Sequence, residues 1–205
     1  MRKKTLFLTL ILAIICITFC FSSNVYAAQQ YEAPYTNYRL IRGVSNMYYY
    51  VDSSANSYIP LINNSVNNWI DTGYGWNPIY MYPVASNYAT EIDFYVLTGQ
   101  QAADQWGAYN GVLGETFFFR IDETEIGGRE TEDWFFTKIK LNHTNMYLSF
   151  MDDDKRQGTI THEIGHALGL NHQSNIYSIM CQTGAGRVVQ RVDQASHNYI
   201  NEMYN

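Results

Sequence analysis

The residues best suited to chemistry lie between His162 and His172, where the sequence reads HEIGHALGLNH. On a helix, His162 and His166 are four residues apart, so their side chains lie on one face and can direct two imidazole nitrogens toward one point. Gly169 can adopt a positive φ at no steric cost, so the helix can end there and the chain can turn back to bring His172 toward the same point. The spacing therefore predicts one metal ion bound by these histidines.

This donor set also indicates which metal and which reaction to expect. Neutral imidazoles suit Zn²⁺, and three protein ligands in place of four leave one coordination position open for water, as in catalytic zinc sites. Glu163 follows the first ligand directly, about 100° further round a helix, so its carboxylate lies beside the open position without being a ligand. We therefore predict hydrolysis by metal-activated water, with one catalytic Zn²⁺ on His162, His166 and His172, and with Glu163 as the general base.

The spacing of this stretch resembles the signature of the metzincin zinc endopeptidases, HExxHxxGxxH, at all five specified positions. Metzincins also carry a methionine-containing turn after the third histidine, and Met180 lies eight residues after His172. The resemblance implies an α+β zincin catalytic domain, with a twisted mixed five-stranded sheet and three helices. It also implies an active-site cleft between a large upper and a small lower subdomain, with Met180 as a hydrophobic floor beneath the metal and Gly169 as the turn before the third ligand.

The function that the resemblance implies is that of a small secreted bacterial peptidase similar to matrix metalloproteases (matrixin-like), which hydrolyses internal bonds of protein or peptide substrates. One alternative is a zinc-binding adhesin or peptide-binding module that no longer cleaves, and the intact Glu163 argues against it. A second is a zinc amidase or deacetylase acting on a non-protein amide. Metal chemistry alone does not exclude an amidase, but Gly169 and Met180 are protease features.

The first 27 residues have the pattern of a secretory signal peptide. Basic residues at positions 2–4 precede an apolar run from Leu6 to Phe21, and small residues flank Tyr26 at the positions that a signal peptidase reads. The apolar run is 16 residues long, short of the roughly 20 needed to span a bilayer. We expect cleavage after Ala27, a secreted extracellular protein, and no membrane association after cleavage.

Removal of this leader changes the charge and the cysteine count. It leaves ten basic residues against 19 acidic ones, a net charge of about −9, so nucleic acid is not an expected partner. It also leaves Cys181 as the last cysteine, which excludes an intramolecular disulfide and favours a small buried side chain. We expect a monomer with a short N-terminal segment, 28–45, and one zinc metalloprotease catalytic domain, 46–205.

The rest of the chain predicts the elements that position the site. An amphipathic helix is expected from Pro60, with Trp69 as a core anchor, and a closing helix from Val192 to Tyr204. Segments 99–109 and 122–132 are expected to be loops. Strands are predicted at Asn46–Val51, Pro78–Val84, Glu91–Leu97 and Asp133–Asn142.

The fifth strand is the candidate for binding substrate. The segment Asn110–Arg120 resembles the edge strand above the active-site cleft of matrix metalloproteases, which implies that 112–117 offers its backbone to an extended peptide. Val112, Leu113 and Gly114 are thus candidate substrate-binding residues, and an ordinary sheet strand is the equal alternative.

Two further segments near the motif, one acidic and one polar, give weaker evidence of function. Asp152–Asp154 precede the catalytic helix, where carboxylates stabilise a helix N-terminus; a Ca²⁺ site is possible because relatives bind calcium. The resemblance implies that segment 184–191 forms the wall of the pocket that receives the side chain after the cleaved bond. His143 and His197 are the remaining histidines, too few for the second, structural zinc site of matrix metalloproteases.

Overall fold

The computed structural model describes residues 33–127 and 131–205. The predicted signal peptide, residues 1–27, lies outside the described residues. Of the predicted N-terminal segment, the part from Ala33 onward is described.

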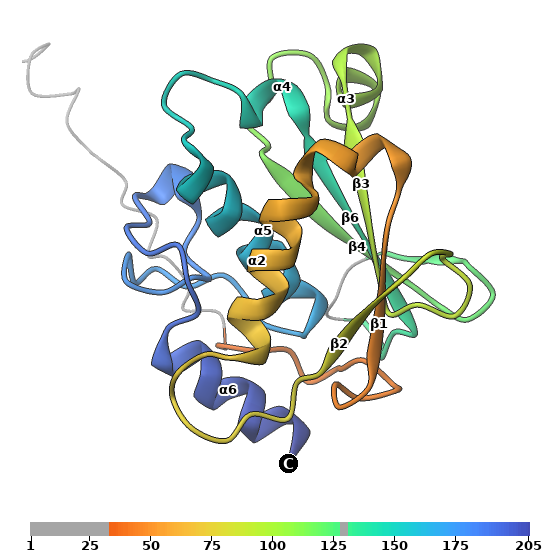
Figure 1. The fold of residues 1–205 in the computed structure, drawn as a ribbon, viewed down its shortest axis with the longest axis vertical. Coiled ribbons are helices and arrows are strands. Elements are labelled where there is room, and N and C mark those ends of the chain that lie inside the picture. The colour runs from red at the N-terminus through yellow and green to blue at the C-terminus, as the bar shows by residue number, and fades with distance from the viewer. Residues whose placement is uncertain (1–32, 128–130) are drawn as a thin grey trace, which may run out of the picture. The chain divides into compact units, whose positions relative to one another are not determined.

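The centre of the fold is a mixed sheet of six strands in the order β2-β1-β3-β6-β4-β5 (Figure 1). β1 pairs in parallel with β2 and β3, β3 pairs in parallel with β6, and β4 runs antiparallel to β6 and β5. The strands are β1 Met47–Val51, β2 Met81–Val84, β3 Ile92–Leu97, β4 Gly114–Phe119, β5 Glu125–Ile126 and β6 Phe136–Asn142. The α+β class expected from the sequence is confirmed.

The counts of strands and helices exceed the prediction of five and three. The additional strand is β5, two residues within the predicted loop 122–132, where buried Ile126 pairs with Phe118. A two-residue strand is too short to leave an alternating pattern in the sequence. Segment 99–109, also predicted as a loop, contains the helix α3, Gly99–Trp106, which begins at a capping box formed by Thr98 and Gln101.

Two helices lie together on one face of the sheet (Figure 1). They are α2, Ile59–Ile70, and α5, Asp153–Ala167, the helix of the histidine motif. The other helical elements are η1 Ser53–Tyr58, α4 His143–Met146, η2 Thr183–Ala185 and α6 Gln194–Tyr204. In the described part of the chain, no helix is long and apolar enough to cross a membrane.

The second half of α5 is buried all round, which explains its weak amphipathic pattern. Every residue from Gly158 to Ala167 is buried. Two fully buried indoles fix its position: Trp69 Nε1 on α2 donates to Thr161 O at 2.9 Å, and Trp134 Nε1 donates to Ala167 O at 3.2 Å. The predicted core role of Trp69 is confirmed. The helix that carries the candidate chemistry is therefore held between α2 and the sheet.

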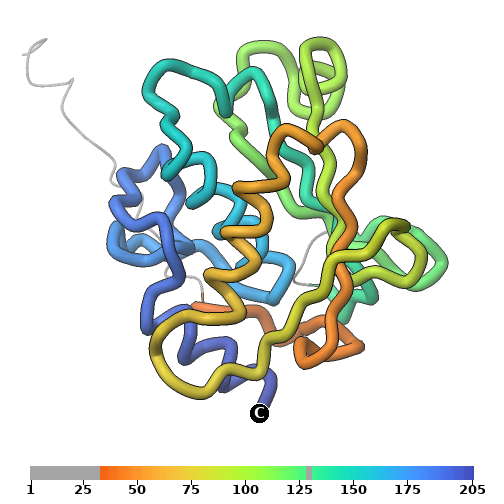
Figure 2. Tube along the Cα trace, in the orientation of Figure 1, coloured from red at the N-terminus to blue at the C-terminus, as the bar shows by residue number. Residues whose placement is uncertain are grey.

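The end of α5 is tied to the segment that precedes the sheet. Thr36 N donates to Gly169 O at 3.0 Å and Asn171 N donates to Pro34 O at 3.0 Å, around a bridge between Tyr35 and Leu170. After this point the chain runs through a long stretch with little regular structure before it enters α6 (Figure 2).

Candidate metal centre

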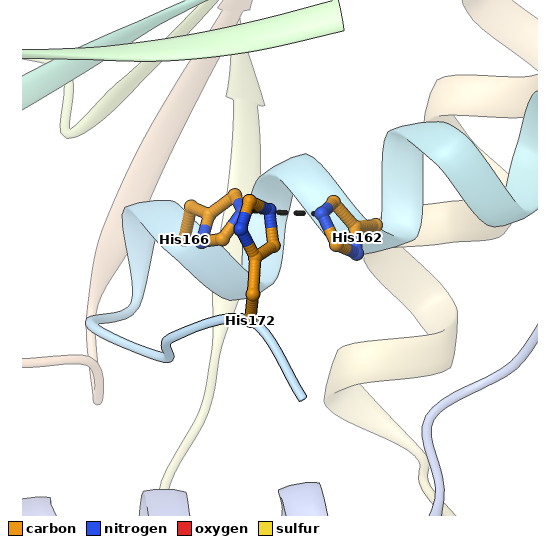
Figure 3. Close-up of side chains that lie close together, drawn as sticks. All are labelled: His162, His166 and His172. Atoms are coloured by element: carbon orange, nitrogen blue, oxygen red, sulfur yellow. Dashed lines mark hydrogen bonds between the residues drawn. The ribbon is translucent and has the colours of Figure 1, made fainter. Parts of the chain in front are cut away.

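Three imidazole rings converge at the C-terminal end of α5 (Figure 3). His162 and His166 lie on the helix, and His172 lies in the segment that follows it. His166 Nε2 is 3.1 Å from His162 Nε2 and 3.0 Å from His172 Nε2. The helical spacing and the turn after it thus bring all three rings together.

The hydrogen bonds of the other ring nitrogens define which atoms face the centre. His162 Nδ1 lies 2.8 Å from Ile179 O, and His166 Nδ1 lies 2.7 Å from Leu170 O. A carbonyl oxygen can only accept, so Nδ1 of His162 and of His166 carries the hydrogen, and in the neutral rings Nε2 of both presents a lone pair. Lone pairs this close repel each other unless a cation lies between them. Tetrahedral Zn²⁺ with bonds of about 2.0–2.1 Å would hold its ligand nitrogens about 3.3 Å apart, so the donor set fits zinc.

Gly169 provides the turn that brings the third histidine back. Its φ of +101° lies in the left-handed region, and Leu170 N donates to Gly165 O at 2.9 Å as α5 ends. The same turn points Leu170 O at His166. A Cβ at position 169 would also lie 2.5 Å from Met203 Cε on α6. The positive φ therefore disfavours any other residue here, and a side chain would also require the end of the Met203 side chain to move.

Met180 packs against the helix beneath the histidines. It is 1% exposed, and a Cβ built on Gly165 would lie only 2.4 Å from its Sδ. Its backbone is held by Ser178 Oγ, which accepts from Met180 N at 3.1 Å, and by Gln173 N, which donates to Met180 O at 3.0 Å. Gly165 thus allows Met180 to lie under the helix segment between His162 and His166.

Glu163 is buried beside the histidines and contacts β4. Glu163 is only 5% exposed, and the Thr116 hydroxyl lies within hydrogen-bond distance of two of its acceptors, Oε2 at 2.8 Å and the backbone O at 3.0 Å. Gly114 lies on the same face of β4 as Thr116, and a Cβ there would lie 3.2 Å from Glu163 Cγ. Sequence reasoning missed Thr116, although its place two residues after Gly114 puts it on the same face of the strand.

A pocket of about 590 Å³ adjoins the three histidines and Glu163. The predicted substrate-binding residues Val112, Leu113 and Gly114 lie on one wall. The lining also includes segment 182–184 and Arg187. Gly184 and Arg187 belong to segment 184–191, which was expected to line the pocket, but Arg187 itself was not among the predicted site residues. The lining is completed by Trp106, Gly111, Glu115, Thr116 and Thr159.

β4 has an open edge beside this pocket. It pairs with β6 along its whole length, but β5 pairs only with Phe118 and Phe119. Within the described residues, 114–117 therefore have a strand on one side only. This position at the edge of the sheet agrees with the edge-strand expectation better than with that of an ordinary inner strand. The strand begins two residues later than expected, and Val112 and Leu113 precede it.

The acidic residues before α5 act on the helix itself. Asp152 accepts from Lys155 N at 2.9 Å, and this backbone hydrogen bond lowers the pKa of the Asp152 carboxyl. Asp153 pairs with Arg156 Nη1 at 2.6 Å. Neither contact indicates Ca²⁺, and among the described residues the group of three or more potential metal ligands is the histidine triad.

The two other histidines and the free cysteine lie elsewhere in the core or its rim. His143 Nδ1 is 3.1 Å from the Tyr58 hydroxyl, and His197 Nδ1 is 2.8 Å from Thr72 Oγ1. Cys181 is buried, and burial raises the pKa of its thiol.

Four features together define a metzincin-type metallopeptidase domain. They are a helix with the HExxH motif, a third histidine after a glycine turn, a methionine packed beneath the histidines, and a mixed sheet beside the helix. The family model of the matrixins matches residues 86–205, more than half of the chain, and includes the whole motif and Met180. The chain therefore belongs to the matrixin family of zinc metallopeptidases. The search of curated proteins found no significant match.

Proposed function

We propose that the protein is a zinc-dependent endopeptidase in which Glu163 is the general base. The observation that carries the proposal is the convergence of three Nε2 atoms beside a buried carboxylate, on a pocket bounded by an open strand edge. His162, His166 and His172 would hold the metal. A bound Zn²⁺ would supply a Lewis acid that acts on the scissile carbonyl and on the attacking water.

The protein's own groups divide the remaining tasks. Glu163 accepts the proton of the attacking water and passes it to the leaving amine, acting first as a base and then as an acid. The Thr116 hydroxyl, 2.8 Å from Glu163 Oε2, restrains the carboxylate. An extended peptide would add to the open edge of β4 at residues 114–117, so that its backbone crosses the pocket beside Glu163.

The experiment that tests this proposal separates metal binding from turnover. The full chain is loaded with zinc and assayed on protein substrates with and without a chelator. Glu163→Gln should keep its zinc but lose about 10²–10⁴-fold in kcat/KM, because the base is removed and the ligands are not. His166→Ala should lose both zinc and activity.

Glu125→Gln, at the exposed position of β5, is the matched control and should retain both zinc and activity. An active Glu163→Gln enzyme would sink the assignment of the base. A zinc-loaded wild-type protein that cleaves no peptide would favour a non-catalytic binding module, and hydrolysis of non-protein amides in place of peptides would favour an amidase.

We also propose that the protein acts outside the cell, on the basis of the signal-peptide pattern in residues 1–27, and that it is a monomer. Protein recovered from culture medium should begin at Ala28 and elute as a single chain in size-exclusion chromatography. Retention of the full-length chain in the cell would contradict this proposal.

A further inference from the structure

Arg187 is a buried cation on the wall of the pocket that the mechanism does not use. Its residue is only 7% exposed, and it belongs to the pocket lining together with the histidines and Glu163. Nη1 donates to Ile179 O at 3.4 Å and to Cys181 O at 3.3 Å. Nε and Nη2 have no hydrogen-bond partner among the described residues. Nη1 thus anchors the guanidinium, and Nε and Nη2 remain able to donate to a bound ligand.

The guanidinium keeps its charge in this position. Burial lowers the pKa of Arg187 to about 10, and the nearby thiol of Cys181 and carboxylate of Glu163 act in the opposite direction. At neutral pH the side chain is therefore a cation. No ion pair joins it to a carboxylate in the described part of the chain. A buried charge with unpaired donors is unfavourable, so a partner that supplies a negative charge would be bound strongly.

The surroundings of Arg187 favour a polar guest. Besides the histidines, Glu163 and Arg187, the pocket lining from α5 and from the segment after Met180 consists of Thr159, Gln182, Thr183 and Gly184, none of which has a large apolar side chain. Ile179 O accepts from both Arg187 and His162 Nδ1, so the guanidinium lies one carbonyl away from a candidate zinc ligand. A side chain that reaches Arg187 must therefore belong to a residue next to the cleaved bond.

We propose that Arg187 is a specificity-determining residue that selects substrates with an aspartate or glutamate side chain next to the cleaved bond. This inference rests on the proposed peptidase function. A carboxylate can accept two parallel N–H bonds from a guanidinium edge and neutralises its charge. An aliphatic side chain would leave the same N–H groups unpaired, and an amide would supply one neutral acceptor.

The first test is the cleavage preference of the zinc-loaded full chain. A peptide library with random residues on both sides of the bond is digested, and the cleaved sites are read by mass spectrometry. Aspartate and glutamate should be enriched at one position adjacent to the bond, and the resemblance to matrixins places it after the bond. Resynthesised peptides with Glu should exceed their Gln and Leu counterparts in kcat/KM by about 10- to 100-fold, as expected for hydrogen bonds to a charged group.

Variants then separate recognition from a purely structural role of Arg187. Arg187→Gln should remove the preference of Glu over Gln, and Arg187→Lys should keep part of it, because a lysine keeps the charge but loses the paired donors. Arg191→Gln is the matched control: Arg191 is exposed, donates to Asn68 Oδ1 at 3.1 Å and lies outside the pocket lining. If Arg187 only anchored its neighbouring carbonyls, its variants would lose stability and zinc while the Glu-to-Gln ratio stayed the same.

A binding measurement keeps this inference separate from the proposed activity. Glu163→Gln protein, which should not turn over substrate, is titrated calorimetrically with the Glu and Gln peptides. The Glu peptide should bind about 10-fold tighter or more, and the double variant Glu163→Gln/Arg187→Gln should lose that difference. If the Arg187 variants do not fold, the preference of the Glu163→Gln protein alone decides.

The cleavage and titration experiments distinguish failure of the Arg187 proposal from failure of the proposed peptidase function. Cleavage of many peptides with no acidic preference would overturn the role of Arg187 and leave the peptidase intact. Absence of any cleavage by the zinc-loaded wild type would overturn the peptidase, and the titrations would still show whether Arg187 binds a carboxylate.

Discussion

Replacement of Gly165 by alanine tests how closely Met180 supports the metal centre. Gly165 lies in α5 between His162 and His166, one residue before the second. By helix propensity alone, alanine should stabilise the helix by about 1 kcal/mol. The structure predicts the opposite sign, because the new methyl group would lie 2.4 Å from Met180 Sδ and 3.1 Å from Trp69 Cζ2.

The size of the effect follows from how little these neighbours can move. Trp69 is fully buried and is held by its hydrogen bond to Thr161 O, and Met180 is 1% exposed. Overpacking of such a site costs about 1–3 kcal/mol. After the gain in helix propensity, we expect a net loss of about 1 kcal/mol, within a range of about 0–2 kcal/mol, and a fall in Tm of about 2–4 °C for a domain of this size.

A second effect should reach the zinc ligands. Moving Met180 shifts its neighbour Ile179, whose carbonyl orients His162 through Nδ1 at 2.8 Å. Loss of such an outer hydrogen bond typically weakens metal binding by about 10- to 100-fold. We therefore expect Gly165→Ala to bind zinc at least about 10-fold more weakly than the wild type.

Thermal unfolding with excess zinc and zinc competition against a chelator measure the two effects. Gly158→Ala is the control in the same helix, because its methyl group meets mainly the side-chain end of Gln190, on the wall of a different pocket of about 650 Å³. It should leave zinc affinity unchanged. In a Met180→Ala background the cost of Gly165→Ala should fall to within about 0.5 kcal/mol of zero. A Gly165→Ala protein with a raised Tm and wild-type zinc affinity would refute the reasoning.

Three further substitutions probe other contacts. Asp193→Ala should reduce the free energy of unfolding by about 2 kcal/mol in urea titrations, because it removes the cap of α6 and the acceptor 2.8 Å from buried Ile179 N. Asp193→Asn should lose less free energy of unfolding, and equal losses in the two variants would contradict this explanation. Thr116→Val should lower kcat/KM about 10-fold at unchanged zinc content by freeing Glu163, and unchanged kinetics would exclude that restraint. Burial raises the pKa of Asp93 to about 6, above its ordinary 3.8. Between these values the folded carboxyl holds a proton that the unfolded one releases, so the stability from Asp93 falls as pH rises to about 6. Asp93→Asn should therefore stabilise the protein above pH 6, by no more than about 3 kcal/mol, and not below pH 4; an equal effect at both pH values in urea titrations would contradict the assignment.

The sequence could predict the parts of the fold that leave a periodic apolar pattern or a known motif in it. The spacing of the histidines, the glycine turn and the apolar period around Trp69 are local patterns, and the structure has the corresponding helix end, turn and buried indole. The matrixin match agrees with the family indicated by the motif. β5 and α3 were missed because two residues cannot show a period, and because the polar helix α3 buries only Ala102.

The site contacts that the sequence could not predict come from single residues far apart in the chain. Thr116 meets Glu163 across 47 positions, and nothing in the sequence singles out Arg187 within segment 184–191, which was expected to line the pocket. A threonine in a strand or an arginine in a loop is ordinary by itself. The pairing of β4 with β6 and the packing of α5 against them place Thr116 at the Glu163 carboxylate, and the carbonyls of Ile179 and Cys181 hold Arg187 at the pocket.

The orientation of the imidazoles depends on backbone that no motif specifies. Two carbonyls fix the ring nitrogens, one from Leu170 in the glycine turn and one from Ile179 before Met180. Ile179 N is in turn held by the Asp193 carboxylate at 2.8 Å, at the start of α6. Zinc affinity and the folding of the whole stretch from α5 to α6 must therefore be linked, because the rings are directed only once that stretch is folded. The same motif placed on an isolated helix would have the ligands and lack the groups that aim them.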